Sequence, residues 1–312
     1  MKSGVRNQKG VALVITLLVL TLLLTIILEF NLGMRVEARA AANFRDDMKA
    51  YYLAKSGITF AIALLEENAR TEPNHDSLNE LWAQKIPTIP VGDGFVSVEI
   101  SDEDSKINVN KLATGFGAVT GDNMRTLMVR FLERFELKSE LADTIADWID
   151  QDDTERPNGA EKSYYEGLET PYEAKNKPLD SLPELRLIKG MDNDTFDRIK
   201  KFLTVNSDGL ININTTSKEV LMSLSDELTG AMADEVIAVR IENPFEQIQE
   251  LGERTSIGNR TPLYGEISKF ITVKSNYFSI TAAGEINQNK KIINALVKRD
   301  GEKSKIVYWR VE

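Results

Sequence analysis

The stretch from Val11 to Leu28 reads VALVITLLVLTLLLTIIL, eighteen residues without a charged side chain. As a helix that rises about 1.5 Å per residue it would be about 27 Å long, which suits the ~30 Å hydrocarbon core of a bilayer. The short flank before it contains Lys2, Arg6 and Lys9. Because positive flanks stay cytoplasmic, the pattern predicts a single pass through the inner membrane with the bulk of the chain in the periplasm.

Three interpretations of this stretch compete. The first is a plain signal anchor. The second is a cleaved secretory signal ending at Ala38-Arg39-Ala40, although the apolar run is too long and a polar segment separates it from that site. The third is a prepilin leader, cut between Gly10 and Val11 so that the apolar helix is retained. The segment resembles that pattern with one departure, because the fifth residue after the cut is usually Glu and is Ile15 here.

The composition excludes several classes of chemistry. The 312 residues include no cysteine and one histidine, so thiol catalysis, zinc–cysteine sites and histidine-cluster sites are excluded. That histidine, His75, lies in a polar stretch and is expected in a solvated loop. Acidic pairs can do glycosidase-like work, but nothing in the sequence orients one, so we expect no enzymatic activity.

The helical pattern continues beyond the membrane segment. We expect one helix from about Val11 to Glu67, because no proline occurs before Pro73 and apolar residues recur at helical spacing. The stripe expected to pack on a sheet comprises Phe44, Met48, Tyr51, Ile58, Ala61 and Leu65. The expected strands are 94–100, 277–283, 292–298 and 306–311. Sheet at both ends of the chain predicts an α+β, type IV pilin-like domain interrupted by an insertion.

The insertion contains an internal repeat. Its units open with INVN at 107–110 and ININ at 211–214, and each closes with a similar KF-x-TV segment. We expect two helical units, so that the insertion is all-α. The predicted divisions are a cleaved leader (1–10), the first part of the pilin domain (11–104), the first unit with an acidic loop (105–207), the second unit (208–273) and the second part of the pilin domain (274–312).

Each unit is expected to be a helix-hairpin-helix or SAM-like repeat, with Gly190 at the tight turn of the first. In DNA-binding versions such a hairpin presents backbone amides and lysines to phosphate. Between residues 105 and 271, however, 20 Lys and Arg stand against 30 Asp and Glu, and the whole chain carries −10. This charge argues against nucleic-acid binding and favours a contact with protein.

The acidic residues are densest between 147 and 173, where the loop reads DWIDQDDTERPNGAEKSYYEGLETPYE. Oxygen ligands on a turning loop suit Ca²⁺, which takes six to eight of them. The candidate ligands are Asp150, Asp152, Asp153 and Glu161. The register is not that of an EF-hand. A solvated acidic loop, or a helix that simply ends at Asp147 and Asp150, remains the alternative to a metal site.

Together these segments resemble the type II secretion minor pseudopilin K (GspK) family over nearly the full length. The resemblance rests on Gln8-Lys9-Gly10, the apolar helix, the INVN and ININT openings, the DWIDQD loop with NGAE at 158–161, and LPEL at 182–185. It implies a pilin domain with a large helical insertion, and calcium binding. It also implies cleavage and N-methylation at Gly10 and Val11 by prepilin peptidase, an inner-membrane assembly platform, and assembly with minor pseudopilins I and J.

Two features predict a place at the filament tip. In pilus cores the usual glutamate offsets the N-terminus of a neighbouring subunit, and a carboxylate without that partner costs about 2.5–3.5 kcal/mol on insertion scales. A subunit with nothing above it does not need the glutamate, which explains Ile15. An insertion of this size would also clash if repeated along a filament. The predicted function is to initiate and cap a pseudopilus that exports folded proteins. A type IV minor pilin and a membrane-anchored DNA receptor stay as alternatives.

Overall fold

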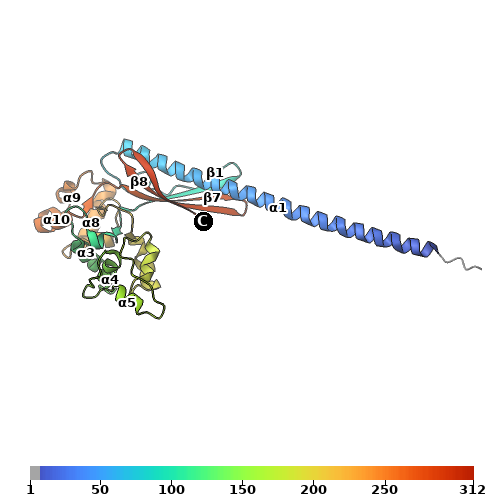
Figure 1. Ribbon diagram of the computed structural model, residues 1–312. Coiled ribbons are helices and arrows are strands. Elements are labelled where there is room, and N and C mark those ends of the chain that lie inside the picture. The colour runs from blue at the N-terminus through green and yellow to red at the C-terminus, as the bar shows by residue number, and fades with distance from the viewer. Residues whose placement is uncertain (1–7) are drawn as a thin grey trace, which may run out of the picture.

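The computed structural model describes residues 8–312 and shows a long helix that lies along a sheet, with a helical body at one end (Figure 1). The helices are α1 (Gln8–Thr71), α2 (Lys111–Thr114), α3 (Gly121–Arg134), α4 (Leu141–Ile149), α5 (Lys162–Glu166), α6 (Asn193–Ile199), α7 (Lys218–Ser223), α8 (Gly230–Glu242), α9 (Gln249–Arg254) and α10 (Thr261–Ile267), with 3₁₀ turns at Leu182–Leu187, Lys200–Phe202 and Ser256–Asn259. The strands are β1 (Ile89–Val91), β2 (Gly94–Asp102), β3 (Ile107–Asn108), β4 (Leu203–Thr204), β5 (Ile211–Asn212), β6 (Ile271–Thr272), β7 (Tyr277–Ile286), β8 (Asn289–Asp300) and β9 (Lys303–Val311). Lys2 and Arg6 of the predicted leader lie outside the described residues.

Helix α1 has two halves with different surroundings. Residues 10–41 are exposed and project away from the rest of the molecule (Figure 1). Within residues 8–312, α1 is the one helix long and apolar enough to cross a membrane, judged by length and composition. The helix then runs on without a break to Thr71, which confirms the predicted continuous helix.

The second half of α1 packs on the sheet through small side chains. Ala50 and Ala54 are fully buried. A Cβ on Gly57 would lie 3.0 Å from the Val98 side chain, so the backbones of helix and sheet approach closely. Small residues on one helix face permit this approach, because no side chain holds the two elements apart.

The predicted core stripe of α1 is therefore correct in part. Ile58, Ala61 and Leu65 are buried as expected. The prediction is wrong for Phe44, which is 69 % exposed, and for Met48, which is 36 % exposed. Alanine and glycine occupy the first part of the face toward the sheet, and Phe44 and Met48 are left on the solvent side of the helix.

Replacing Gly284 with Ala should strongly destabilise the pilin domain. A Cβ there would lie 2.1 Å from the carbonyl oxygen of Ala50, so β7 and α1 would have to separate. Overpacking of this kind costs about 1–3 kcal/mol or more. Gly265→Ala in α10 is the control, because within residues 8–312 no atom outside the adjoining backbone of α10 lies within 4 Å of a Cβ at that position. Urea unfolding of the detergent-solubilised chain measures both, and equal losses would contradict the packing argument.

The five-stranded sheet has the order β1-β2-β7-β8-β9, and all its pairings are antiparallel. The four predicted strands are present as β2, β7, β8 and β9, so the α+β class with a long helix on an antiparallel sheet is confirmed. Strand β1 was not predicted. It contains Pro90, which cannot donate to a strand ladder and is tolerated because β1 is an edge strand.

The insertion is mostly helical, but the all-α prediction is wrong in one respect. Each unit is closed by a short parallel strand pair, in which Ile107 aligns with Leu203 in the first unit and Ile211 aligns with Ile271 in the second. These pairs join the opening of each repeat to its closing segment. The hairpin turn at Gly190 has a left-handed φ of +85°, and the helix-hairpin-helix description stays a prediction.

The repeated asparagines explain why the two openings are alike. Asn110 Oδ1 accepts a hydrogen bond from the backbone N–H of Leu179 at 2.7 Å, and its Nδ2 donates to the Leu179 carbonyl at 3.0 Å. Asn214 makes the same pair of bonds with Phe245, at 2.9 and 2.8 Å. Leu179 and Phe245 occupy equivalent places after a proline. Each asparagine therefore pairs both backbone groups of one residue in a distant loop and so fixes that loop in place.

The segment that follows α1 is partly buried, at residues 75–77 and at Trp82, which the sequence did not suggest. The prediction of a solvated His75 is wrong, because this side chain is 9 % exposed and its Nε2 lies 3.5 Å from Glu80 Oε1. Trp82 packs edge-to-face on Phe278 of β7, with 5.1 Å between ring centroids. Polar residues of this segment, together with Trp82, thus anchor it between the sheet and the insertion.

Three buried aspartates lie where the pilin domain meets the insertion, and the carboxylate of Asp102 accepts a hydrogen bond from the insertion. Asp102 Oδ2 accepts hydrogen bonds from Ser275 Oγ at 2.6 Å and from Thr215 Oγ1 of the second unit at 2.5 Å. Asp104 Oδ2 accepts from the backbone N–H groups of Asn276 at 2.6 Å and Tyr277 at 3.0 Å. The third is Asp76, which pairs with the buried guanidinium of Arg299. We call Asp76, Asp102, Asp104 and Arg299 the junction cluster.

Candidate functional site

The acidic loop folds so that three carboxylates converge. Asp147 lies in the last turn of α4, Asp150 follows the end of that helix, and Glu161 precedes the first residue of α5. Each offers one oxygen, and these three oxygens lie within 4.8 Å of one another. We call Asp147, Asp150 and Glu161 the carboxylate triad.

Asp147 is the structural member of the triad. It is fully buried, and its Oδ2 accepts hydrogen bonds from the backbone N–H groups of Ala160 at 2.9 Å and Arg156 at 3.2 Å. Its Oδ1 accepts from Arg156 Nη1 at 2.5 Å. A Cβ on Gly159 would lie 1.7 Å from Asp147 Oδ2, so the loop can close over this carboxylate only because residue 159 is glycine.

The other two members have oxygens without partners. Asp150 Oδ1 and both carboxylate oxygens of Glu161 are buried and receive no hydrogen bond from any residue of the described chain. Glu161 is 3 % exposed. Burial, and then the charges of Asp147 and Asp150, raise the pKa of Glu161 to about 7. Burial likewise raises the pKa of Asp150, against the effect of Arg156.

Three unpartnered oxygens in one place are unfavourable, since a buried polar atom without a partner costs about 1–3 kcal/mol and a charged one costs more. A cation would remove this cost by supplying a ligand bond to each. Carboxylate oxygens are the ligands that Ca²⁺ prefers. The residues present therefore fit a hard divalent cation.

The structure separates the four predicted ligands into two groups. Asp150 and Glu161 belong to the triad, whereas Asp152 and Asp153 are exposed on the outer part of the loop. The Thr154 side chain and N–H group lower the pKa of Asp152, and Asp153 Oδ1 accepts from Asn176 Nδ2 at 3.0 Å. Sequence reasoning did not name Asp147 as a candidate. Its i, i+3 spacing from Asp150 at a helix end is the signal that could have found it.

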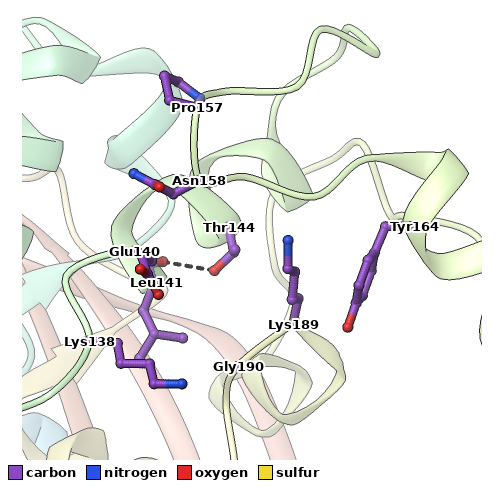
Figure 2. Close-up of a pocket in the computed structure, with 9 residues that line it drawn as sticks. All are labelled: Lys138, Glu140, Leu141, Thr144, Pro157, Asn158, Tyr164, Lys189 and Gly190. Atoms are coloured by element: carbon purple, nitrogen blue, oxygen red, sulfur yellow. Dashed lines mark hydrogen bonds between the residues drawn. The ribbon is translucent and has the colours of Figure 1, made fainter.

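A hollow of about 500 Å³ lies beside the same loop (Figure 2). Pro157 and Asn158 of the loop line one wall, and Lys189 reaches into it from the hairpin at Gly190. Lys189 Nζ donates to the Gly159 carbonyl at 2.9 Å. The turn that closes over Asp147 is thus fastened from outside by the hairpin.

The predicted processing residues lie at the start of α1. Gly10 and Val11 are exposed in the projecting half of the helix, and no described atom lies within 4 Å of a Cβ on Gly10. Ile15 lies one turn further along and is 57 % exposed. Cleavage at this site, and the role of Ile15 at the filament tip, stay predictions.

A long apolar-to-amphipathic helix on an antiparallel sheet, interrupted by a helical insertion, defines a membrane-anchored, pilin-like protein. Family models described as "Type II secretion system (T2SS), protein K" match residues 105–208 and 211–274, together more than half of the chain. The chain therefore belongs to the type II secretion system protein K family and is a minor pseudopilin of that system.

Relatives and a solved structure agree with this assignment. The chain is 26 % identical to type II secretion system protein K of Aeromonas hydrophila, with 98 % of this chain and 97 % of that protein covered. It is 27 % identical to the protein of the same name from Pseudomonas aeruginosa, over 96 % and 91 % of the two chains. A chain of the GspK-GspI-GspJ complex from enterotoxigenic Escherichia coli has the same fold, with a TM-score of 0.72, 20 % identity, and coverage of 88 % of this chain and 99 % of that one.

Proposed function

We propose that this pseudopilin initiates and caps the pseudopilus, and so supports the export of folded periplasmic proteins across the outer membrane. The observation that carries the proposal is the placement of the insertion. It forms a helical body at one end of the sheet, at the end opposite to the projecting half of α1 (Figure 1). With α1 bundled into a filament core, this body would lie where a subunit stacked above would have to pack.

The projecting half of α1 supplies the filament contact in this proposal. Its exposed apolar surface is stable in a bilayer and equally stable among the apolar helices of other subunits. Prepilin peptidase would cut between Gly10 and Val11 and methylate the new N-terminus, leaving Ile15 at the fifth position. The assembly platform would then move the chain from the membrane into the filament, with its bulk on the periplasmic side.

We assign minor pseudopilins I and J as the partners at the tip. The support is the fold shared with a chain of a GspK-GspI-GspJ complex. If the assignment is correct, this chain should co-purify with the I and J proteins from detergent extracts, with all three in equal amounts. A gold label on the insertion should then mark one end of each pseudopilus. Label distributed along the filament shaft would contradict the cap, and purification of this chain without I and J would contradict the partners.

The second part of the proposal is a calcium site at the carboxylate triad. The support is the three buried oxygens without partners, which belong to Asp150 and Glu161. Asp147 would position the loop and add charge. Bound Ca²⁺ would offset the repulsion among these carboxylates and stabilise the loop between α4 and α5.

The insertion itself is proposed to contact protein rather than DNA. If its units are helix-hairpin-helix repeats, the hairpin at Gly190 is the element that would hold phosphate. Lys189 is already engaged there, because its Nζ donates to Gly159 and its backbone N–H donates to the Tyr165 hydroxyl at 3.3 Å. Together with the acidic excess of the insertion, this favours a structural role for the hairpin.

A further inference from the structure

The carboxylate triad contains a positive charge of its own. Arg156 Nη1 lies 2.5 Å from Asp147 Oδ1 and 2.5 Å from Asp150 Oδ2. The side chains of Asp147, Asp150 and Arg156 are only 0, 11 and 21 % exposed. Three carboxylates and one guanidinium give this buried group a net charge of −2 when all are ionised.

Arg156 and the unpartnered oxygens lie on different atoms of the same carboxylates. Asp150 directs Oδ2 to Arg156, whereas its Oδ1 and both oxygens of Glu161 have no hydrogen-bond partner among residues 8–312. Asp147 has both oxygens occupied by Arg156 and the backbone. A cation can therefore take the free oxygens of Asp150 and Glu161 while the guanidinium keeps its own contacts.

We propose, on the basis of the calcium site assigned above, that Arg156 sets the charge selectivity of that site. With Arg156 in place the group has a net charge of −2. A divalent ion brings the total charge to zero, whereas a trivalent ion brings it to +1. Buried charge is costly unless it is compensated, so the ion that brings the net charge of the site to zero should bind most favourably. The neighbouring carboxylates of Asp152 and Asp153 are exposed, and water screens their contribution.

The prediction is that Arg156→Gln shifts the preference toward trivalent ions. Without the guanidinium the group has charge −3, so Tb³⁺ neutralises it and Ca²⁺ does not. The ratio of the Tb³⁺ to the Ca²⁺ association constant should rise by about tenfold or more, because each unit of charge interacts strongly at these distances. Titration calorimetry of the full chain in detergent, with each ion alone, measures this ratio.

Two further variants separate charge from geometry. Arg156→Lys keeps the positive charge and should leave the ratio close to that of the wild type. The double variant Asp147→Asn with Arg156→Gln removes one charge of each sign and restores −2, so the ratio should return toward the wild-type value. The double variant also leaves no buried carboxylate unpaired at position 147. The ratio of association constants can therefore be measured in it if Arg156→Gln alone does not fold.

The outcomes distinguish this inference from the site on which it rests. A wild-type chain that binds neither ion overturns both. A wild-type chain that binds Ca²⁺, with the same ion ratio in Arg156→Gln and in Arg156→Lys, overturns the role of Arg156 and leaves the calcium site standing. A double variant that keeps the raised ratio of Arg156→Gln would show that Arg156 acts through geometry and not through charge, which also overturns the proposal.

Discussion

Glu161→Gln should remove most of the stability that calcium gives the wild-type chain. Binding of a ligand to the folded state alone stabilises it by about 2.7 kcal/mol when the free ligand is a hundredfold above Kd. The wild-type insertion should therefore melt several degrees higher in calcium than in EDTA. Glu161 supplies two of the three unpartnered oxygens, and the neutral amide offers one weaker ligand oxygen.

In EDTA the same variant should be at least as stable as the wild type. The substitution removes a carboxylate that is 3 % exposed and lies near Asp147 and Asp150, so the cost of burying a further negative charge beside them disappears. The melting temperatures of the two proteins are thus expected to change order between EDTA and calcium. Scanning calorimetry of the detergent-solubilised chain in both buffers gives all four values.

Asp153→Asn is the matched control, because Asp153 belongs to the same loop but is exposed and outside the triad. It should keep the full response to calcium. A response lost in Asp153→Asn and retained in Glu161→Gln would place the ion on the outer loop. If neither variant loses the stabilisation by calcium, the metal site does not lie in the acidic loop.

The fold was largely predictable because long periodic segments carry strong signals. The apolar run from Val11 to Leu28 and the alternation at Val96, Val98 and Ile100 indicate a helix and a strand without any tertiary information. The helix face was not predictable in the same way. Hydrophobic periodicity favoured Phe44, whereas the close approach of α1 to β7 selects Ala50 and other small residues that such patterns weigh lightly.

The ligand atoms of the candidate site likewise could not be predicted from the sequence. Density of acidic residues located the loop, but all its carboxylates look alike in the sequence. Which oxygens lack a partner depends on Arg156 and on the turn at Gly159, which take both oxygens of Asp147 and one of Asp150. The junction cluster was missed altogether, since Asp76, Asp102 and Arg299 come from three separate parts of the chain.

Asp104→Asn should stabilise the chain at pH 8 and have little effect at pH 4. Burial, and then the charge of Asp102, raise the pKa of Asp104 to about 8, and burial raises that of Asp102 to about 6. A carboxyl whose pKa is raised by folding contributes its stability below the unfolded value of about 4 and loses it as the pH rises through the folded value. Ionisation of these two groups should therefore weaken the junction as the pH rises from 4 to 8.

Asparagine at position 104 resembles the protonated acid and keeps an oxygen for the N–H groups of Asn276 and Tyr277. Since one pKa unit corresponds to about 1.4 kcal/mol, a gain of roughly 1–3 kcal/mol at pH 8 is expected after allowance for relaxation of the site. Urea unfolding of both proteins at pH 4, 6 and 8 measures the difference. The experiment is best done in the Glu161→Gln background, because Glu161 titrates near pH 7 and would add its own pH dependence.

The control for this experiment is Asp194→Asn, whose side chain is 84 % exposed and should give no difference that grows with pH. A loss of stability in Asp104→Asn at pH 8 would show that Asp104 is held ionised by its two backbone donors. In that case the junction would be strongest at high pH, where both carboxylates are charged. The sign of the change between pH 4 and pH 8 thus decides whether Asp104 is protonated or ionised in the folded junction cluster at pH 8.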